Sequence, residues 1–403
     1  MKNFIFAIAM VGLFFFSPLL SQNKYPIVLV HGFMGWGTDE MGPYMYWGGW
    51  HNLVQELEEE GYTVIVASVG PVSSSWDRAI ELFYLIKGGQ IDYGKGHSNK
   101  FDLIQKPVEK NYKGLYPQWS EKNPLHFIGH SMGGQTIRML DYLLNNTFQD
   151  SIGNNEISQL LGKSNRGWIN SITTMSTPHN GTTISDFVNA GIPFLQNFIA
   201  LAGVAGNSFY DFDLEQWGFK RSDDESWVTY FKRMRQHSIW DSKNTVAWDS
   251  SIEGAKEINT ICIANPDVYY FSLANYKTKL DESSGYHKPI SDMSNILKVQ
   301  ARLMGRKKAY FIDGASTDST WYLNDGVVNT SSMYGPTTGA NGPDPISLYR
   351  EGEVLIPGQW YIMGEFEYDH SAFIGHQINK KEFKDLKNIY LNHMEILWNL
   401  PKP

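Results

Sequence analysis

The chain of 403 residues is large enough for a sizeable core, since 42% of its residues are hydrophobic and 14% are aromatic. Its net charge is −8 and its isoelectric point is about 5.8, which argues against a nucleic-acid partner. The single cysteine, Cys262, excludes a disulfide within the chain. These properties favour one large α/β domain or two smaller ones.

An uncharged apolar run extends from Phe4 to Leu20, after one lysine and before the polar stretch "SQNK". This pattern is typical of a secretory signal peptide. An uncleaved membrane anchor is the alternative, since the run is nearly long enough to span a bilayer. Pro18 and the small residues beyond it favour cleavage. We therefore expect residues 1–21 to be a signal peptide and the mature chain to be secreted and extracellular.

Strands and helices alternate along most of the remaining chain. Apolar runs predict buried strands within residues 25–33, 63–70, 125–128, 168–178 and 268–276. Amphipathic patterns predict helices around residues 52–61, 74–89, 135–144 and 380–400. The alternation indicates an α/β fold with a mostly parallel sheet and helices on both faces.

The strand rhythm stops between about residues 181 and 259. An almost wholly apolar stretch, residues 186–207, lies in this insert, and an amphipathic helix is predicted within residues 218–236. A buried core helix and a mobile lid over a substrate pocket both explain so apolar a stretch. Its position directly after "STPHNGTT", at the end of a strand where α/β sites lie, favours the lid.

The stretch "LHFIGHSMGGQTIRML" puts Ser131 at a turn between an apolar strand and an amphipathic helix. Gly129 and Gly133 stand two residues to either side, where larger side chains would collide in so sharp a turn. This context predicts that Ser131 is a nucleophile rather than a hydroxyl at the start of a helix.

A nucleophilic serine needs a base within hydrogen-bond reach and an acid that orients the base. In α/β-hydrolase folds the chain order is serine, acid, histidine. His370, which ends the apolar and aromatic run "GQWYIMGEFEYDH", is the expected base. Asp325, in a tight turn before a glycine, is the expected acid, with Asp318 and Asp369 as rivals.

The tetrahedral intermediate of acyl transfer needs two backbone N–H donors. Met132, the residue after the nucleophile, and Phe33, in the loop after the first strand, are the expected donors of this oxyanion hole. Aromatic residues also gather in "MGPYMYWGGW". They either line an acyl pocket or pack in the core, and we favour packing for most of them. The four aromatic residues are Tyr44, Tyr46, Trp47 and Trp50.

Several stretches together resemble the bacterial true lipases of the thermostable (thermoalkalophilic) and staphylococcal type. In chain order they are "PIVLVHGFMGWG", "YWGGW", "VASVGPVSSSWDRAIELF", "GGQIDYGKGH", "GHSMGGQTIRML", "TPHNGTT", "YDFDLEQWGF", "NDGVVNTSSM" and "YDH". The motifs "SSSWDRA", "IDYG" and "DFDLEQWG" are specific to that family rather than to α/β-hydrolases in general.

The resemblance spans about residues 25–375 and implies an α/β-hydrolase fold. It implies a single lipase domain over residues 22–403, with a helical lid region at about 181–259. The family's triad falls on Ser131, Asp325 and His370, and its oxyanion donors fall on Phe33 and Met132. One departure is at Gly129, where those lipases usually have alanine.

Those lipases also carry structural metals, and here their ligand positions are altered. Asp77 and His97 match two of the four zinc ligands, whereas Leu103 and Asn244 replace the other two, with Asp102 as a candidate substitute. Zinc favours four tetrahedral ligands, so we expect no zinc.

The calcium ligands implied by the resemblance are also altered. Ala372 and Gln377 stand where two acids are expected. Calcium takes six to eight oxygen ligands, usually with carboxylates among them. We therefore expect no calcium, no other metal and no cofactor.

The expected function is a secreted serine carboxylic-ester hydrolase that cleaves acylglycerols, triacylglycerol above all, through an acyl-enzyme. Its substrate lies at an oil–water interface, so we expect transient contact with lipid but no nucleic acid and no obligate protein partner. A phospholipase A1 or a short-chain esterase on the same triad is the alternative. A non-catalytic lipid-binding protein is an alternative of another class, and the intact triad argues against it.

Overall fold

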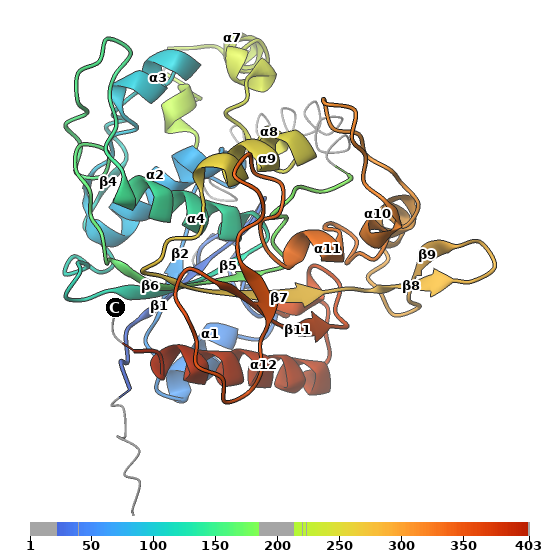
Figure 1. Ribbon diagram of the computed structural model, residues 1–403. Coiled ribbons are helices and arrows are strands. Elements are labelled where there is room, and N and C mark those ends of the chain that lie inside the picture. The colour runs from blue at the N-terminus through green and yellow to red at the C-terminus, as the bar shows by residue number, and fades with distance from the viewer. Residues whose placement is uncertain (1–21, 39, 185–212, 220, 223, 402–403) are drawn as a thin grey trace, which may run out of the picture.

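The structure is a computed structural model that describes residues 22–38, 40–184, 213–219, 221–222 and 224–401. At its centre lies a seven-stranded sheet with the strand order β10-β11-β7-β6-β5-β1-β2 (Figure 1). All six neighbouring pairs in this sheet are parallel. Its strands are β1 (Ile27–Val30), β2 (Val64–Ala67), β5 (Leu125–His130), β6 (Ile169–Met175), β7 (Tyr269–Asn275), β10 (Ile346–Leu348) and β11 (Trp360–Phe366).

Helices cover both faces of the sheet. Helices α1 (Leu53–Glu59) and α12 (Lys380–Trp398) lie on one face, and α2 (Ser75–Lys87), α4 (Met132–Asn145) and α9 (Ile252–Ile261) lie on the other (Figure 1). The α/β-hydrolase expectation of a parallel sheet between two helical layers is therefore confirmed.

Shorter elements decorate this frame. Two antiparallel ribbons stand outside the main sheet, β3 (Gly89–Gln90) with β4 (Asn111–Tyr112) and β8 (Thr278–Asp281) with β9 (Tyr286–Pro289). The other helical elements are α3 (Lys95–Phe101), η1 (Glu215–Trp217), α7 (Trp227–Arg235), η2 (Ser238–Asp241), α8 (Val246–Asp249), α10 (Lys298–Met304), η3 (Ser319–Trp321), α11 (Thr330–Met333) and η4 (Ala372–Ile374).

The two helical layers explain why the central strands are apolar at every position. In β1, Val28 and Val30 belong to the core beneath α2 and α4, whereas Ile27 and Leu29 belong to the core beneath α1 and α12. Side chains alternate between the two faces of a strand, so a strand covered on both faces needs a continuous apolar run.

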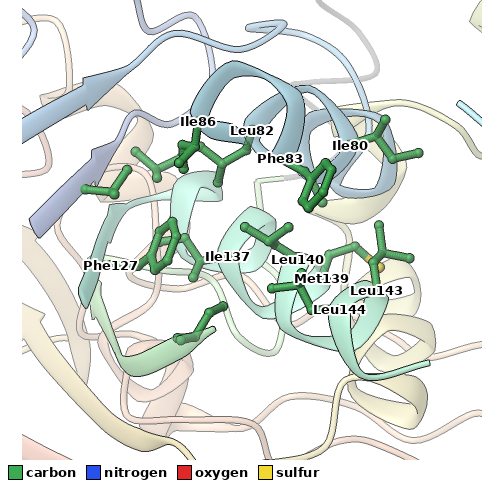
Figure 2. Close-up of a cluster of buried hydrophobic side chains, with 14 of the residues drawn as sticks. Ile80, Leu82, Phe83, Ile86, Phe127, Ile137, Met139, Leu140, Leu143 and Leu144 are labelled. Atoms are coloured by element: carbon green, nitrogen blue, oxygen red, sulfur yellow. The ribbon is translucent and has the colours of Figure 1, made fainter. Parts of the chain in front are cut away.

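The core on the α2 side is formed where α2 packs across α4 (Figure 2). Phe83 of α2 points toward Leu140 of α4, and Ile137 of α4 lies beside Phe127 of β5. Each such side chain stabilises the fold by about 1.5–3 kcal/mol when fully buried. This packing holds α4, and with it Ser131 at its start, firmly on the sheet.

The predicted strands and helices are present, with differences at the edges. The short edge strand β10 was not predicted, because three residues give too brief a pattern. Helix α7 covers only the second half of the predicted stretch 218–236. The apolar stretch 186–207 and residues 1–21 lie outside the described residues. No helix in the described ranges is long and apolar enough to cross a membrane.

Candidate active site

Ser131 lies in a strained turn between β5 and α4. Its φ of 56° and ψ of −129° put a non-glycine residue in the left-handed half of backbone space. Such a conformation costs about 1–3 kcal/mol and persists only where the surroundings fix it. Here the Ser131 N–H donates to the Met175 carbonyl at 2.8 Å, and the Thr177 hydroxyl donates to the Ser131 carbonyl at 2.9 Å.

The two glycines beside this turn are required by close backbone approach. A Cβ on Gly129 would lie 2.5 Å from the carbonyl carbon of Gly133. A Cβ on Gly133 would lie 2.2 Å from the carbonyl oxygen of Val30 in the neighbouring strand β1. Both distances are far below van der Waals contact, as the sequence motif predicted.

His370 and Asp325 form a buried hydrogen-bonded pair. The His370 Nδ1 lies 2.7 Å from the Asp325 Oδ2, and the His370 backbone N–H donates to the Asp325 carbonyl at 3.1 Å. The other carboxylate oxygen, Oδ1, accepts the N–H groups of Val327 and Val328 at 2.8 and 2.7 Å. Asp325 is fully buried, so its carboxylate is fixed on both sides.

The two rival acids, Asp318 and Asp369, make hydrogen bonds to other groups. Asp318 accepts from the Thr320 N–H at the start of the short helix η3, where it is exposed. Asp369 is buried, but its carboxylate accepts the backbone N–H groups of Ser294, Ser371 and Ala372. Of the three candidate acids, only Asp325 is bonded to the His370 ring.

The His370 ring lies directly against the residue before the candidate nucleophile. The rings of His130 and His370 have centroids 4.6 Å apart. His370 follows β11 and His130 ends β5, two strands that lie three positions apart in the sheet. The loop after β11 therefore returns the candidate base to the carboxyl end of β5, where Ser131 lies.

The loop after β1 crosses the hydroxyl of Ser131. A Cβ built on Gly32 would lie 3.1 Å from the Ser131 Oγ. The N–H groups on either side of Phe33 are engaged, with Gly32 donating to the Tyr46 Oη at 2.8 Å and Met34 donating to the Pro71 carbonyl at 3.0 Å. Met132 begins α4, so its N–H is one of the helix-terminal donors with no partner inside the helix.

The aromatic segment after this loop packs mainly in the core. Tyr46 and Trp47 are buried in the core beside α12, as expected of most of these residues. Trp50 is 75% exposed, and its ring contacts Tyr44. Sequence reasoning gave Tyr46 either a place in an acyl pocket or a place in the core, and it missed the hydrogen bonds of the Tyr46 hydroxyl and of the His130 imidazole. The one sequence signal that pointed to His130 was its position directly before Ser131.

At the position where the resemblance implies a zinc ion, side chains are hydrogen-bonded to one another. The two oxygens of Asp77 are bonded to His97 Nε2 at 2.7 Å and to Asn244 Nδ2 at 2.9 Å. The Asn244 Oδ1 accepts from the Ser74 hydroxyl at 2.7 Å, and Leu103 packs into an apolar cluster. The residues present do not fit a zinc ion, because an amide and an aliphatic group replace two of its ligands.

The calcium ligand positions also do not fit an ion. Ala372 has no side-chain oxygen, and the Gln377 Oε1 accepts from the Ser294 hydroxyl at 3.1 Å. Nearby, the Lys277 ammonium donates to Asp292 at 2.8 Å and to Glu367 at 3.1 Å. Across the described part of the chain, no three His, Cys, Asp or Glu side chains gather in a way that suits a metal.

A parallel sheet between helical layers, with a serine elbow at the end of a central strand and a buried His–Asp pair beside it, defines an α/β-hydrolase. Residues 23–399 match the family described as "Lipase-like, C-terminal domain". The chain belongs to this lipase family, of the staphylococcal type.

The similarity extends to named relatives and solved structures. The chain is 36% identical to "Lipase 1" of Staphylococcus aureus strain MRSA252 over 88% of this chain and 51% of that protein. It therefore spans about half the length of the curated relatives it matches. The crystal structure of Staphylococcus hyicus lipase matches with a TM-score of 0.84 at 34% identity, over 94% of this chain and 97% of that one. EstA from Clostridium botulinum matches with a TM-score of 0.83 at 39% identity, over 95% and 89%.

Proposed function

We propose that the chain is a secreted serine hydrolase that cleaves acylglycerol esters through Ser131, His370 and Asp325. The observation that carries this proposal is the buried 2.7 Å contact between His370 and Asp325, beside a serine held in a strained turn. A serine hydroxyl needs such an oriented base to become a nucleophile at neutral pH. The names of the relatives, lipases and EstA, support an ester as the substrate.

In the proposed reaction, the Ser131 Oγ attacks the ester carbonyl while His370 Nε2 takes its proton. The carbonyl oxygen becomes an oxyanion that accepts from the Phe33 and Met132 N–H groups. His370 then returns the proton to the alcohol leaving group as the carbonyl–oxygen bond breaks. Water, deprotonated by the same imidazole, releases the fatty acid and restores Ser131. Asp325 holds the imidazole with its proton on Nδ1 throughout.

Each oxyanion donor contributes about 3–4 kcal/mol to the stability of the transition state in enzymes of this kind. The engagement of the Gly32 and Met34 amides by Tyr46 and Pro71 supports Phe33 as the donor of its loop. The proposal keeps one lipase domain over residues 22–403, a lid region at about 181–259 and a signal peptide over residues 1–21. It includes transient contact with a lipid surface and requires no cofactor.

The test is a pH-stat assay on emulsified long-chain triacylglycerol, with the wild type compared with Ser131→Ala. Release of fatty acid that disappears in Ser131→Ala would support the proposal. Ser131-dependent cleavage of a short soluble ester alone would make the protein an esterase. Release from a phospholipid but not from triacylglycerol would make it a phospholipase A1. No reaction with any of these esters would overturn the proposal in favour of lipid binding.

A further inference from the structure

The Tyr46 phenol and the His130 imidazole join the loop after β1, the end of β5 and the loop after β11. The Gly32 N–H donates to the Tyr46 Oη at 2.8 Å, and the Tyr46 Oη lies 2.7 Å from the His130 Nδ1. The other ring nitrogen, His130 Nε2, lies 3.1 Å from the backbone carbonyl oxygen of His370. Gly32 precedes the proposed oxyanion donor, His130 precedes the proposed nucleophile, and His370 is the proposed base.

Donor and acceptor chemistry fixes the direction of every bond in this chain. A backbone N–H only donates, so the Tyr46 oxygen accepts from Gly32 and its hydroxyl hydrogen points to His130 Nδ1. The remaining proton of a neutral imidazole is then on Nε2, from which it donates to the His370 carbonyl. Burial lowers the pKa of His130 well below its ordinary value, so the ring stays neutral.

The surroundings hold Tyr46 rigidly. Its ring meets the Trp36 ring edge-on with centroids 5.3 Å apart. Its backbone carbonyl lies 2.9 Å from the His376 Nε2, and the Gly48 N–H donates to the Ile374 carbonyl at 2.7 Å. The segment around Tyr46 is thus fastened to the loop that follows His370 as well as to the loop after β1.

We propose that Tyr46 and His130 are positioning residues. They fix the loop after β1, which carries the proposed oxyanion donor Phe33 and is here called the oxyanion loop, relative to the proposed base His370. This inference rests on the proposed function. The hydrogen bonds of the two side chains go to backbone groups and to each other, and the His130 ring also packs against the His370 ring with centroids 4.6 Å apart. The two residues act through the backbone of Gly32, next to the Phe33 amide, and through the backbone of His370 itself. Hereafter this chain of bonds, from Gly32 through Tyr46 and His130 to His370, is called the relay.

These bonds matter for function because an active site tolerates little displacement of its catalytic groups. Displacement of a catalytic group by about 1 Å lowers the rate on the order of 100-fold, although the substrate still binds. Among the described residues, the hydrogen bonds of Asp325 go to His370, Val327 and Val328, so they orient the His370 ring but do not fix the loop after β1. The relay connects the oxyanion loop to the His370 loop directly, through the hydrogen bonds of two side chains.

The test uses Tyr46→Phe, His130→Asn and the double variant, assayed on a soluble short-chain ester. Tyr46→Phe keeps the packed ring but removes the bridging hydroxyl. His130→Asn keeps an acceptor near Nδ1 but is too short to reach the His370 carbonyl. We expect each variant to lower kcat about 10- to 100-fold with little change in KM, because only the reacting geometry changes.

The relay also predicts strong coupling between the two positions. Breaking either link disconnects the loops, so the double variant should be no more than about threefold slower than the slower single variant. The inhibition constant of an alkyl boronic acid, whose Ser131 adduct is tetrahedral and negatively charged, should rise in proportion to the loss of kcat/KM. A purely structural role would not produce this proportionality.

Tyr270→Phe is the matched control. Tyr270 is also buried, accepts the Asn265 N–H at 2.8 Å and donates to Asp141 at 3.0 Å. It stands near the amino end of β7, at the edge of the sheet opposite the proposed site. We expect this variant to lose thermal stability to a similar extent as Tyr46→Phe while kcat, KM and boronic acid inhibition stay unchanged.

The outcomes separate the two proposals. Wild-type hydrolysis that is lost in Ser131→Ala, together with relay variants that behave like Tyr270→Phe, would overturn the relay and leave the proposed function intact. Additive losses in the double variant would also overturn the relay. An inactive wild type would overturn the proposed function and the relay's role with it. If Tyr46→Phe does not fold, His130→Asn alone carries the comparison of kcat, KM and inhibition.

Discussion

The Asn244 amide donates to the Asp77 carboxylate at 2.9 Å, and this bond joins helix α2 to the segment before α8 across 167 positions of sequence. His97 occupies the other carboxylate oxygen. Side chains thus bond to each other at the position where the resemblance implies a zinc ion. The junction between the α/β frame and the insert is held by neutral and charged hydrogen bonds of the protein itself.

Because Asp77, His97 and Asn244 are bonded to one another, we predict that the stability of the protein does not depend on a metal ion. We expect the melting temperature of the wild type to be unchanged by EDTA or by added Zn²⁺. The double change Leu103→His and Asn244→Asp restores the four ligand types, so its melting temperature should rise by several degrees with Zn²⁺ and fall with EDTA. Scanning calorimetry measures both. A wild type that melts earlier in EDTA would contradict the prediction.

Asp325→Asn should lower kcat on the order of 10³- to 10⁴-fold. The N–H groups of Val327 and Val328 both point at the Oδ1 position, so the amide oxygen of the variant must take that place. Its NH₂ group then faces His370 Nδ1 and donates to it. The proton of the neutral imidazole is therefore on Nε2, and this nitrogen can no longer accept the proton of Ser131.

The measurement for this variant is the single-turnover rate of acyl-enzyme formation at Ser131. Asp318→Asn is the matched control, because that carboxylate bonds only within its own turn and faces solvent. The control should keep the wild-type rate. A loss in Asp318→Asn as large as in Asp325→Asn would exclude our choice of acid.

Asp249→Asn should stabilise the protein at pH 8 but much less at pH 4. Asp249 is buried, and its Oδ2 accepts the Ser75 N–H at 2.5 Å. Burial, assisted by the nearby charge of Asp77, raises the pKa of Asp249 to about 7. The folded state therefore binds this proton more tightly than the unfolded state, whose pKa is about 3.9.

The contribution of Asp249 to the free energy of unfolding is complete below about pH 4 and is lost as the pH rises to about 7. Asparagine keeps an acceptor for Ser75 but does not ionise, so it avoids a loss on the order of 4 kcal/mol. Urea unfolding at pH 4 and pH 8 tests this, and an equal difference at both values would refute the raised pKa.

Gly133→Ala should destabilise the fold by about 3 kcal/mol and abolish hydrolysis. The new methyl would lie 2.2 Å from the Val30 carbonyl oxygen, and β1 cannot retreat because it pairs with β2 and β5 on its two sides. The turn at Ser131 must open instead. Thermal melting and the rate of Ser131 phosphonylation measure the two effects.

Gly153→Ala is the comparison for this variant. Gly153 has a φ of 83° in an exposed loop, and a Cβ there would meet no atom within 4 Å. It should lose about 1 kcal/mol from backbone strain alone and keep its full activity. Equal losses of activity at both glycines would rule out a specific role of the Gly133 contact.

Local structure was readable from the sequence because neighbouring residues encode it. The apolar runs predicted the central strands, since strands buried on both faces need apolar side chains at every position. The turn at Ser131 was predicted from its two flanking glycines, because the collisions that forbid side chains there arise within the turn and with the adjacent strand. The sequence likewise showed that Leu103 and Asn244 replace two of the zinc ligands that the resemblance implies.

Pairings between distant loops were decided only by the tertiary structure. Sequence order left three acids open for His370, and only the packing of the loops after β7 and β11 brings Asp325 to its ring. The bond from Tyr46 to His130 spans 84 positions, and the bond from Asn244 to Asp77 spans 167. No local period encodes such contacts, because they depend on how the loops close over the carboxyl edge of the sheet once the helices on its two faces have packed.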